Sequence, residues 1–461
     1  MAVISIIGPK GGIGKTTLSI NTAAALTGSL EPTSPDSRVC LVDLDIRLPA
    51  ISSLLDSHPP KTFYDLFETL ENKTCQVDFL RTLYQTLTCF SECLDGEIPP
   101  ESDLLSKSLA DYKNMNVSLF RYSELKFSDQ LHELFLHRGS VRTAADLNIL
   151  KPLLENFDFK EFKETLRARE ENSRPVLEDY LNYIEEYGLS ILGGEVPILG
   201  KKNHRKRINE PEFLVHFLDF LEDVFKRFDH VILDTPAGGV NHMSSLMNFI
   251  EQPLFVFDLS NTIAINGSID ALHSFIDYYE DFSDDFSKDR LTGLDKTFVN
   301  RLIAQRGGAA VAESLESKKF GIVFNRFQDE AEIVHSLDRL REYLEVLGKY
   351  QRYKRRIHIV GMMPYCKIIN ITNNRGVIFY AKDRELSRKM DLIVRNLLTE
   401  NRDSPALDWS NKDILRYLHK NGQPSLTGKW AQMAGKLRLN ASYGSEKTQD
   451  PQIGGVPFHR G

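Results

Sequence analysis

A chain of 461 residues, 41% hydrophobic and 26% charged, is typical of an ordinary soluble protein that buries one large α/β domain with additions, or two domains. The formal net charge of -7 provides no overall attraction to nucleic acid or anionic membrane, so any such contact requires a local patch. The five cysteines include no Cys-x-x-Cys pair, which gives no signal for a zinc or iron–sulfur site and favours a reducing cytoplasm.

The first clear pattern is a strand, a glycine-rich loop and a helix. The run Ala2–Ile7 is apolar and β-branched, which predicts a buried strand, and Leu18–Leu26 predicts a helix. Between them, residues 8–17 read Gly-Pro-Lys-Gly-Gly-Ile-Gly-Lys-Thr-Thr, a G-x-x-x-x-G-K-[ST] match in the context that this motif needs. A glycine-rich turn without a ligand is the alternative, but the flanking elements favour nucleotide binding.

The loop has the chemistry of a phosphate site. Its backbone N–H groups and the N-terminus of the following helix attract anionic oxygens. Lys15 would reach the β- and γ-phosphates, and the Thr16 hydroxyl would bind Mg²⁺. We therefore expect the nucleotide to contact Gly11, Gly12, Ile13, Gly14, Lys15, Thr16 and Thr17.

Two further predicted strands end in carboxylates. Arg38–Leu44 is followed closely by Asp45, and the spacing of Asp43 and Asp45 places both side chains on one side of an extended strand. His230–Asp234 has the Walker B arrangement, in which the terminal aspartate holds Mg²⁺ through water. The carboxyl ends of parallel strands face the crevice where ligands bind. Alternatively, the first two aspartates are merely polar residues that end a strand.

Residues 57–187 differ in character from the segments on either side. They contain no convincing strand pattern, and several stretches have helical periodicity with charged outer faces: 61–70, 77–87, 129–136, 144–154 and 159–169. We interpret 57–187 as a mainly helical insertion. Its charged faces are solvated or form a surface for a partner that the sequence does not name.

A strand pattern is found again at Gly188–Leu199, and a basic cluster follows it. The cluster consists of Lys201, Lys202, His204, Arg205, Lys206 and Arg207. Two interpretations stay open: contact with phosphate, of DNA or of a partner subunit's nucleotide, and a solvated loop.

The remaining pattern completes an α/β fold. Three more strands are predicted at Pro253–Asp258, Phe320–Phe324 and Ile357–Val360, and amphipathic helices at Phe213–Phe228 and Glu385–Leu398. We expect a doubly wound, mostly parallel sheet with helices on both faces and the helical insertion. The expected divisions are an ATPase core at 1–56 and 188–400, the insertion at 57–187, and a partly disordered C-terminal extension at 401–461.

The extension contains one amphipathic segment. Leu426, Trp430, Met433 and Leu437 recur at helical spacing beside basic residues. Such a segment either lies on a membrane surface or docks on the protein's own core.

These motifs together carry a family resemblance. Lys10 stands two residues into the glycine-rich loop, and Asp43-Leu-Asp45, Asp234-Thr-Pro-Ala-Gly and Gly361-Met-Met-Pro-Tyr follow in order. The combination resembles the MinD/ParA superfamily of deviant Walker A ATPases. The resemblance covers about residues 1–56 and 188–400.

The resemblance implies roles for several residues. Lys10 would contact phosphate across a nucleotide-sandwich dimer, Asp43 would lie near the Mg²⁺ shell, and Asp45 would orient the attacking water. The catalytic residues would then be Lys10, Lys15 and Asp45. Asn325 would read the adenine ring, unless it is a polar edge-strand residue, and the loop containing Pro364 would wrap the adenine.

The expected function is an ATP-dependent homodimeric switch that requires ATP and Mg²⁺ and hydrolyses slowly until a protein partner stimulates it. Such a switch is cytoplasmic, cycles on a membrane surface or on nonspecific DNA of the nucleoid, and positions cellular machinery or partitions DNA. A metal-cluster carrier or reductase, a tyrosine-kinase-like relative and a weakly catalytic scaffold remain as alternatives.

Overall fold

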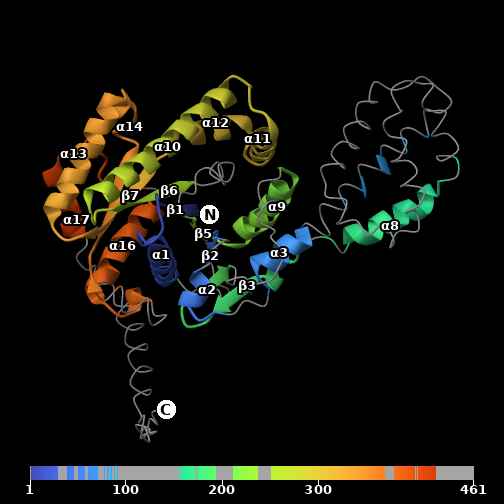
Figure 1. The fold of residues 1–461 in the computed structure, drawn as a ribbon, viewed down its shortest axis with the longest axis horizontal. Coiled ribbons are helices and arrows are strands. Elements are labelled where there is room, and N and C mark those ends of the chain that lie inside the picture. Colours follow the sequence, from blue (N-terminus) through green and yellow to red (C-terminus); the bar gives the residue numbers. More distant parts are fainter. Residues whose placement is uncertain are drawn as a thin grey trace, which may run out of the picture.

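The computed structural model describes residues 2–29, 39–45, 50–57, 61–70, 157–171, 175–193, 211–236, 251–367, 378–399 and 403–421, with single residues between these ranges. Within them, eight strands form one sheet in the order β3-β4-β2-β5-β1-β6-β7-β8 (Figure 1). The strands are β1 (Ala2–Ile7), β2 (Val39–Asp43), β3 (Leu181–Ile184), β4 (Leu189–Leu192), β5 (His230–Asp234), β6 (Gln252–Asp258), β7 (Phe320–Phe327) and β8 (Ile357–Pro364). Neighbouring strands run parallel except β3 and β4, so the predicted mostly parallel sheet is confirmed.

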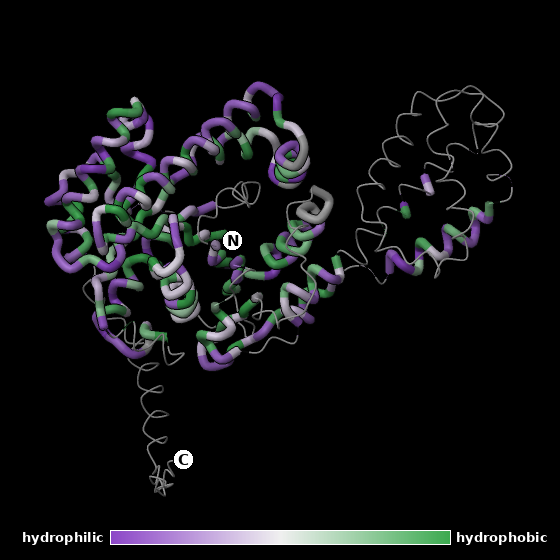
Figure 2. Tube along the Cα trace, in the orientation of Figure 1, coloured by the Kyte–Doolittle hydropathy of each residue, from purple (hydrophilic) through white to green (hydrophobic). Residues whose placement is uncertain are grey.

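Alternating side chains divide the apolar residues of the sheet between two cores. On β2, Cys40 and Val42 belong to the first core, whereas Val39 and Leu41 belong to the second. This period of two is expected of a sheet that is covered on both faces. Figure 2 shows hydrophobic and hydrophilic residues alternating along the covering helices, whose apolar sides supply the rest of each core.

Helices cover both faces, as a doubly wound sheet requires. The first core includes residues of α3 (Phe63–Thr69), α9 (Pro211–Arg227), α10 (Thr262–Ser287), α11 (Gly293–Arg306), α12 (Gly308–Ser317), α13 (Glu330–Val346), α14 (Tyr350–Tyr353) and α17 (Asn411–Asn421). The second includes residues of α1 (Lys15–Ser29), α2 (Ile51–Leu54), the short 3-10 helix η7 (Phe379–Ala381) and α16 (Arg384–Leu398). Two further helices lie within the described residues, α8 (Phe159–Glu171) and the 3-10 helix η4 (Leu177–Asp179).

Part of the segment 57–187 belongs to the core. Phe63, Leu66 and Phe67 of α3 are buried in the first core, and β3 pairs antiparallel with β4. No strand was expected here, because the four residues Leu181–Ile184, followed by two glutamates, give only a weak pattern. α8 is helical as predicted, whereas 129–136, 144–154 and most of 77–87 lie outside the described residues. The limits of the insertion remain a prediction.

The start of the C-terminal extension packs on the sheet. The Tyr417 hydroxyl on α17 donates to Asn396 Oδ1 at 2.7 Å, and Asn396 Nδ2 donates to the Val360 carbonyl at 2.7 Å. His358 of β8 also forms an isolated antiparallel bridge with Ala406. Residues 403–421 are therefore structurally continuous with the core, whereas the amphipathic segment 426–437 lies outside the described residues.

Candidate functional site

A glycine-rich loop joins β1 to α1 at the centre of the sheet, where β1 lies between β5 and β6. Gly12 and Gly14 have φ angles of 75° and 92°, in the left-handed region that favours glycine. A Cβ atom on Gly14 would lie 2.6 Å from Asn325 Nδ2, whereas one on Gly11 or Gly12 would meet no atom within 4 Å. The loop is therefore held closely at Gly14 and leaves room for a phosphate beside Gly11 and Gly12, while the Ile13 side chain anchors it in the second core.

Lys15 is the first residue of α1, and its side chain is buried in the loop that precedes it. Its Nζ donates a 3.0 Å hydrogen bond to the carbonyl oxygen of Lys10. Burial lowers the pKa of the Lys15 ammonium, and the charges of Asp234 and Asp45 oppose this shift. The structure thus places Lys15, Asp45 and Asp234 within electrostatic reach of one another at the helix N-terminus, where an anion binds favourably.

Two hydroxyls on α1 hold the carboxylate at the end of β5. Thr16 Oγ1 donates to Asp234 Oδ2 at 2.7 Å, and Ser19 Oγ donates to Asp234 Oδ1 at 2.9 Å. Burial raises the pKa of Asp234 to about 6, against the lowering effect of these hydrogen bonds. The predicted Mg²⁺ ligands Thr16 and Asp234 are therefore in contact. A hydroxyl and a carboxylate are the oxygen donors that Mg²⁺ takes in P-loop proteins, so the donor set fits the ion.

Asp43 lies beside Asp234 in the sheet register but has different partners. Its Oδ1 accepts the N–H of Asp45 at 3.0 Å, and its Oδ2 accepts the N–H groups of Ala50 and Ile51 at 2.9 and 3.1 Å. Burial, followed by the nearby Asp234 charge, raises the pKa of Asp43 to about 7. The Asp43 carboxylate thus holds the start of α2 and the backbone of Asp45, and its predicted place near Mg²⁺ stays a prediction.

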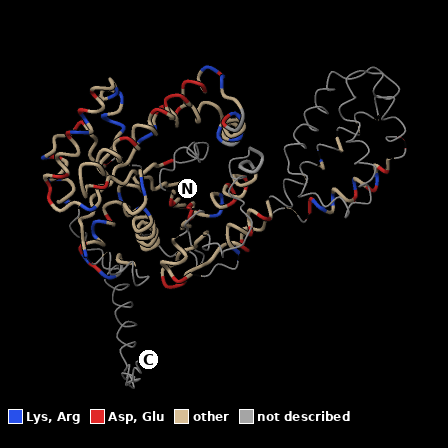
Figure 3. The backbone as a smooth tube through the Cα atoms, viewed as in Figure 1, with Lys and Arg blue, Asp and Glu red and all other residues tan. Residues whose placement is uncertain are grey.

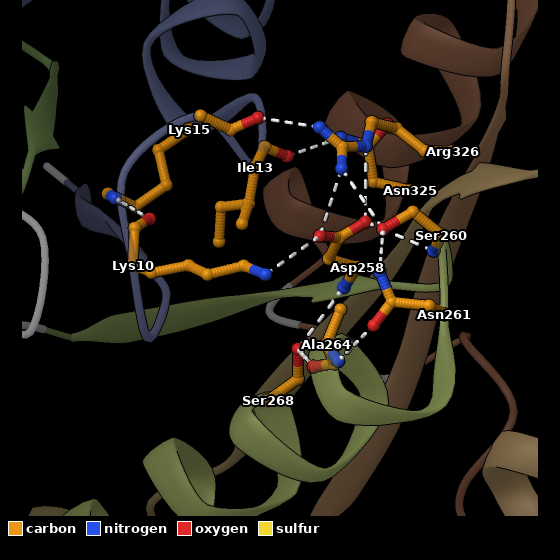
Figure 4. Close-up of polar contacts among 11 residues, drawn as sticks. Lys10, Ile13, Lys15, Asp258, Ser260, Asn261, Ala264, Ser268, Asn325 and Arg326 are labelled. Atoms are coloured by element: carbon orange, nitrogen blue, oxygen red, sulfur yellow. Dashed lines mark hydrogen bonds and ion pairs between the residues drawn. The ribbon is translucent and has the colours of Figure 1, made fainter.

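Asn325 and Arg326, two consecutive residues of β7, contact the loop. Asn325 Nδ2 donates to the Ile13 carbonyl at 2.6 Å, and Arg326 Nη1 donates to the Gly12 carbonyl at 2.6 Å (Figure 4). Arg326 also forms a bidentate pair with Asp258 of β6, with both N–O distances at 3.1 Å. Asn325 was a predicted site residue. Arg326 and Asp258 were not assigned any role from the sequence.

A signal for Asp258, although not for its contact with Arg326, is present in the sequence. Asp258 is the last residue of β6, in the same position at a strand's carboxyl end as Asp43 and Asp234. Asn325 lies opposite Asp258 in the β6–β7 register, and Arg326 directly follows Asn325 near the end of β7. The criterion that selected the first two aspartates therefore also selects the third.

Lys10 points out of the loop toward the same carboxylate. Its Nζ lies 4.0 Å from Asp258 Oδ2, and half of its side chain is exposed, whereas the Asp258 side chain is fully buried. Figure 4 shows the Lys10 amine directed away from Lys15 and toward Asp258. The two lysines of the loop thus occupy different environments.

The sequence matches a known family over most of this architecture. A family model described as the CobQ/CobB/MinD/ParA nucleotide binding domain matches residues 4–378. The chain belongs to this family. No curated protein sequence matches the chain.

Solved structures of this family have low identity to the chain. The cell division ATPase MinD of Pyrococcus furiosus is 13% identical, with 87% of this chain and 99% of that chain covered and a TM-score of 0.40. MinD of Pyrococcus horikoshii complexed with Mg-ADP is 13% identical, with coverages of 86% and 95% and a TM-score of 0.38. A variant of McdA from Cyanothece in complex with ATP is 12% identical, with coverages of 87% and 96% and a TM-score of 0.37.

The segment Gly361–Tyr365 was predicted to be a loop that wraps the base, but in this MinD/ParA-family chain it is strand as far as Pro364, because β8 continues beside β7. Pro364 ends β8 opposite Phe327, and the N–H of Tyr365 donates to the Phe327 carbonyl at 2.8 Å. Asn325 pairs with Met363 in the same register, so the two predicted adenine-contacting positions, Asn325 and Pro364, lie on adjacent strands near their carboxyl ends. Contact of either residue with adenine stays a prediction.

The basic residues near 349–356 are engaged within the molecule. Lys349 pairs with Asp277 and Glu280, Arg352 pairs with Glu280, and Arg355 pairs with Asp408. Figure 3 shows both signs of charge along the peripheral helices. The basic cluster 201–207 lies outside the described residues. Among the helices that the structure describes, none combines the length and the apolar character needed to cross a membrane.

Proposed function

We propose that this MinD/ParA-family protein is an ATP-dependent dimerising ATPase that works as a spatial switch. The observation that carries this proposal is the different placement of the two lysines of one loop. Lys15 is buried among the groups that would hold phosphate, whereas the Lys10 side chain is half-exposed on the outer side of the loop. The Lys10 amine, on the outer side of the loop, is available to a molecule that approaches from outside.

The residues of the loop would hold the triphosphate of ATP. The loop N–H groups of residues 11–14 and the N-terminus of α1, including Thr17, would bind phosphate oxygens, and Lys15 would neutralise the β- and γ-phosphates. Thr16 and Asp234 would hold Mg²⁺, with Asp43 beside them. When bound, Mg²⁺ would supply positive charge that offsets the negative charge of the phosphate groups.

Hydrolysis would depend on positioning more than on covalent chemistry. Asp45 lies close enough to Lys15 and Asp234 to affect their pKa values, and its carboxylate would orient water near the phosphate end of the loop. Lys10 from a second subunit would add the charge that the site lacks by itself. Hydrolysis would then require dimerisation, and a stimulating protein partner would control its rate.

The first test measures binding and assembly in the same samples. The mass of the protein in solution is determined by light scattering with ATP and Mg²⁺, and nucleotide affinity is measured with a fluorescent ATP analogue. We expect Lys15→Ala to abolish nucleotide binding, and Lys10→Ala to bind ATP but stay monomeric. Asp45→Ala should bind ATP and accumulate as a dimer. Release of inorganic phosphate from ATP is measured in the same samples, and wild-type turnover by Asp45→Ala would disprove the role assigned to Asp45. A monomer under all conditions would disprove the proposed switch.

A second test identifies the surface on which the switch cycles. The purified protein is sedimented with liposomes and, separately, with nonspecific DNA, each with ATP and with ADP. ATP-dependent pelleting with only one of them assigns that surface. If the protein pellets with neither, cycling on a membrane and cycling on DNA are both contradicted.

A further inference from the structure

Asp258 is a buried carboxylate beside the nucleotide loop. Its side chain is fully buried at the end of β6. It accepts two hydrogen bonds from Arg326, and the N–H of Ser260 donates to its Oδ1 at 3.1 Å (Figure 4). A buried carboxylate with several donors is stable only while those donors stay in place.

Arg326 joins this carboxylate to the loop. Its backbone has a φ angle of 63°, which residues other than glycine rarely adopt. Its guanidinium donates to Gly12 and Ser260 as well as to Asp258. Strained residues persist where surrounding contacts determine their conformation, and these contacts come from the end of β6, from Ser260 just after it and from the loop.

Lys10 is the weaker of the two cationic partners. Its Nζ lies 4.0 Å from Asp258 Oδ2, beyond hydrogen-bond distance, and its side chain is half-exposed. The pair is therefore partly screened by water and forms a weak contact that is easily broken. Arg326 instead contacts the same carboxylate with two hydrogen bonds.

We propose that Asp258 is a positioning residue that holds Lys10 against its own subunit before dimerisation, and that Arg326 makes this hold reversible. This inference rests on the proposed function, because it concerns the lysine that would reach the partner. When Lys10 leaves, Asp258 remains paired with Arg326, so no unpaired buried charge is created. Without Arg326, Lys10 is the remaining cationic partner of Asp258 among the residues that the structure describes, and it is held more tightly.

The first experiment follows Lys10 itself and needs no nucleotide or dimer. The full-length, nucleotide-free protein is treated with an amine-acylating reagent, and labelling of Lys10 is measured by peptide mass spectrometry, with buried Lys15 as the internal reference. Asp258→Asn removes the charge but keeps the shape, and should raise Lys10 labelling by up to about fivefold. Arg326→Gln should lower it. The matched control Asp284→Asn removes an exposed, ion-paired carboxylate on α10 and should leave it unchanged.

Unchanged Lys10 labelling in Asp258→Asn overturns the inference, and so does raised labelling in Arg326→Gln. If Arg326→Gln does not fold, Arg326→Lys, which keeps the cation but not the bidentate contact, replaces it and should give an intermediate rate. The Asp258→Asn result decides the inference by itself.

The second experiment separates this inference from the proposed function. Dimer formation is titrated with ATP and Mg²⁺ by light scattering, and Asp258→Asn should reach half-maximal dimer at a lower ATP concentration than the wild type. A wild-type protein that never dimerises disproves the proposed function, although the labelling result still stands as a property of the monomer. A wild type that dimerises while Asp258→Asn requires the same ATP concentration disproves the regulatory part of the inference alone.

Discussion

The Thr16 hydroxyl donates a 2.7 Å hydrogen bond to Asp234, joining the first turn of α1 to the end of β5 across 218 positions of the chain. Each residue was predicted separately to act on Mg²⁺, one from the loop motif and one from the strand end. Their contact shows that the two motifs form one site. The same contact allows the contribution of the metal to be measured.

Thr16→Val removes the hydroxyl and keeps the size of the side chain. We expect ATP affinity in Mg²⁺ to fall by about tenfold or more, because a hydrogen bond or ligand at a charged group contributes about 1.5–3 kcal/mol. Affinity in EDTA should change little, since the loop amides and Lys15 remain. Titration of a fluorescent ATP analogue in both buffers measures this difference.

Thr27→Val is the matched control for this change. Thr27 lies in the last turn of the same helix, and its hydroxyl donates to the Ala24 carbonyl, away from the loop. Thr27→Val should show the same gain in ATP affinity from Mg²⁺ as the wild type. If Thr16→Val keeps that effect as well, Thr16 is not a metal ligand.

Gly14 and Asn325 provide a test of the shape of the loop. Gly14→Ala should lower the free energy of unfolding by about 2 kcal/mol or more, because it combines left-handed strain with a clash against the Asn325 amide. Gly11→Ala, where a Cβ meets nothing within 4 Å, should change it by less than about 0.5 kcal/mol. Urea unfolding without nucleotide measures both.

The double variant Gly14→Ala/Asn325→Ala completes a thermodynamic cycle. Removal of the Asn325 amide relieves the clash, so the double variant should be more stable than the sum of the single changes predicts. Strict additivity would show that Gly14 is required for its backbone angle alone.

Local sequence patterns were sufficient where the chemistry is local. The loop from Gly8 to Thr17 is continuous in the chain, and β1, β2 and β5 are short apolar runs that end at or near the predicted residues. Hydrophobic period and turn residues define such elements without reference to the rest of the fold. The mostly parallel sheet followed from them.

The features that were missed depend on pairing between distant segments. Asp258 contacts Arg326 because β6 and β7 are adjacent in register, which neither strand encodes by itself. β3 is four residues long and becomes a strand by pairing with β4 through the turn that ends at Gly188, whose φ angle is 61°. The Asp258–Arg326 contact and strand β3 therefore depend on tertiary context, which the pattern of a single segment cannot show.

Tyr417 tests whether the start of the C-terminal extension stabilises the core. Its hydroxyl donates to Asn396 Oδ1, and Asn396 is fully buried. Tyr417→Phe leaves this acceptor without that donor, so the free energy of unfolding should fall by about 1–3 kcal/mol. Urea unfolding is the measurement, with Tyr350→Phe as the control, expected within about 0.5 kcal/mol of the wild type. Equal effects of the two changes would mean that α17 docks without this hydrogen bond.

The buried imidazole of His358 should make the docking of residues 403–421 on the core depend on pH. Burial lowers the pKa of its imidazole, while contacts with the Ser404 and Arg355 carbonyls oppose the shift. Below the unfolded pKa of about 6.5, the unfolded chain therefore binds more protons at this residue than the folded chain does. Its contribution to stability is present above that pH and is lost as the pH falls toward the folded pKa, by about 1.4 kcal/mol for each pKa unit between the two states.

The measurement compares wild type with His358→Asn, so that the other titrating groups cancel. The free energy of unfolding is determined by urea titration between pH 7.5 and 5.5 for both proteins. The advantage of the wild type should shrink steadily on acidification, because only the wild type must keep a neutral imidazole buried against β8 and the segment around Ser404. An advantage that grows on acidification would show that the buried imidazole is charged, with both ring nitrogens donating to the two carbonyls.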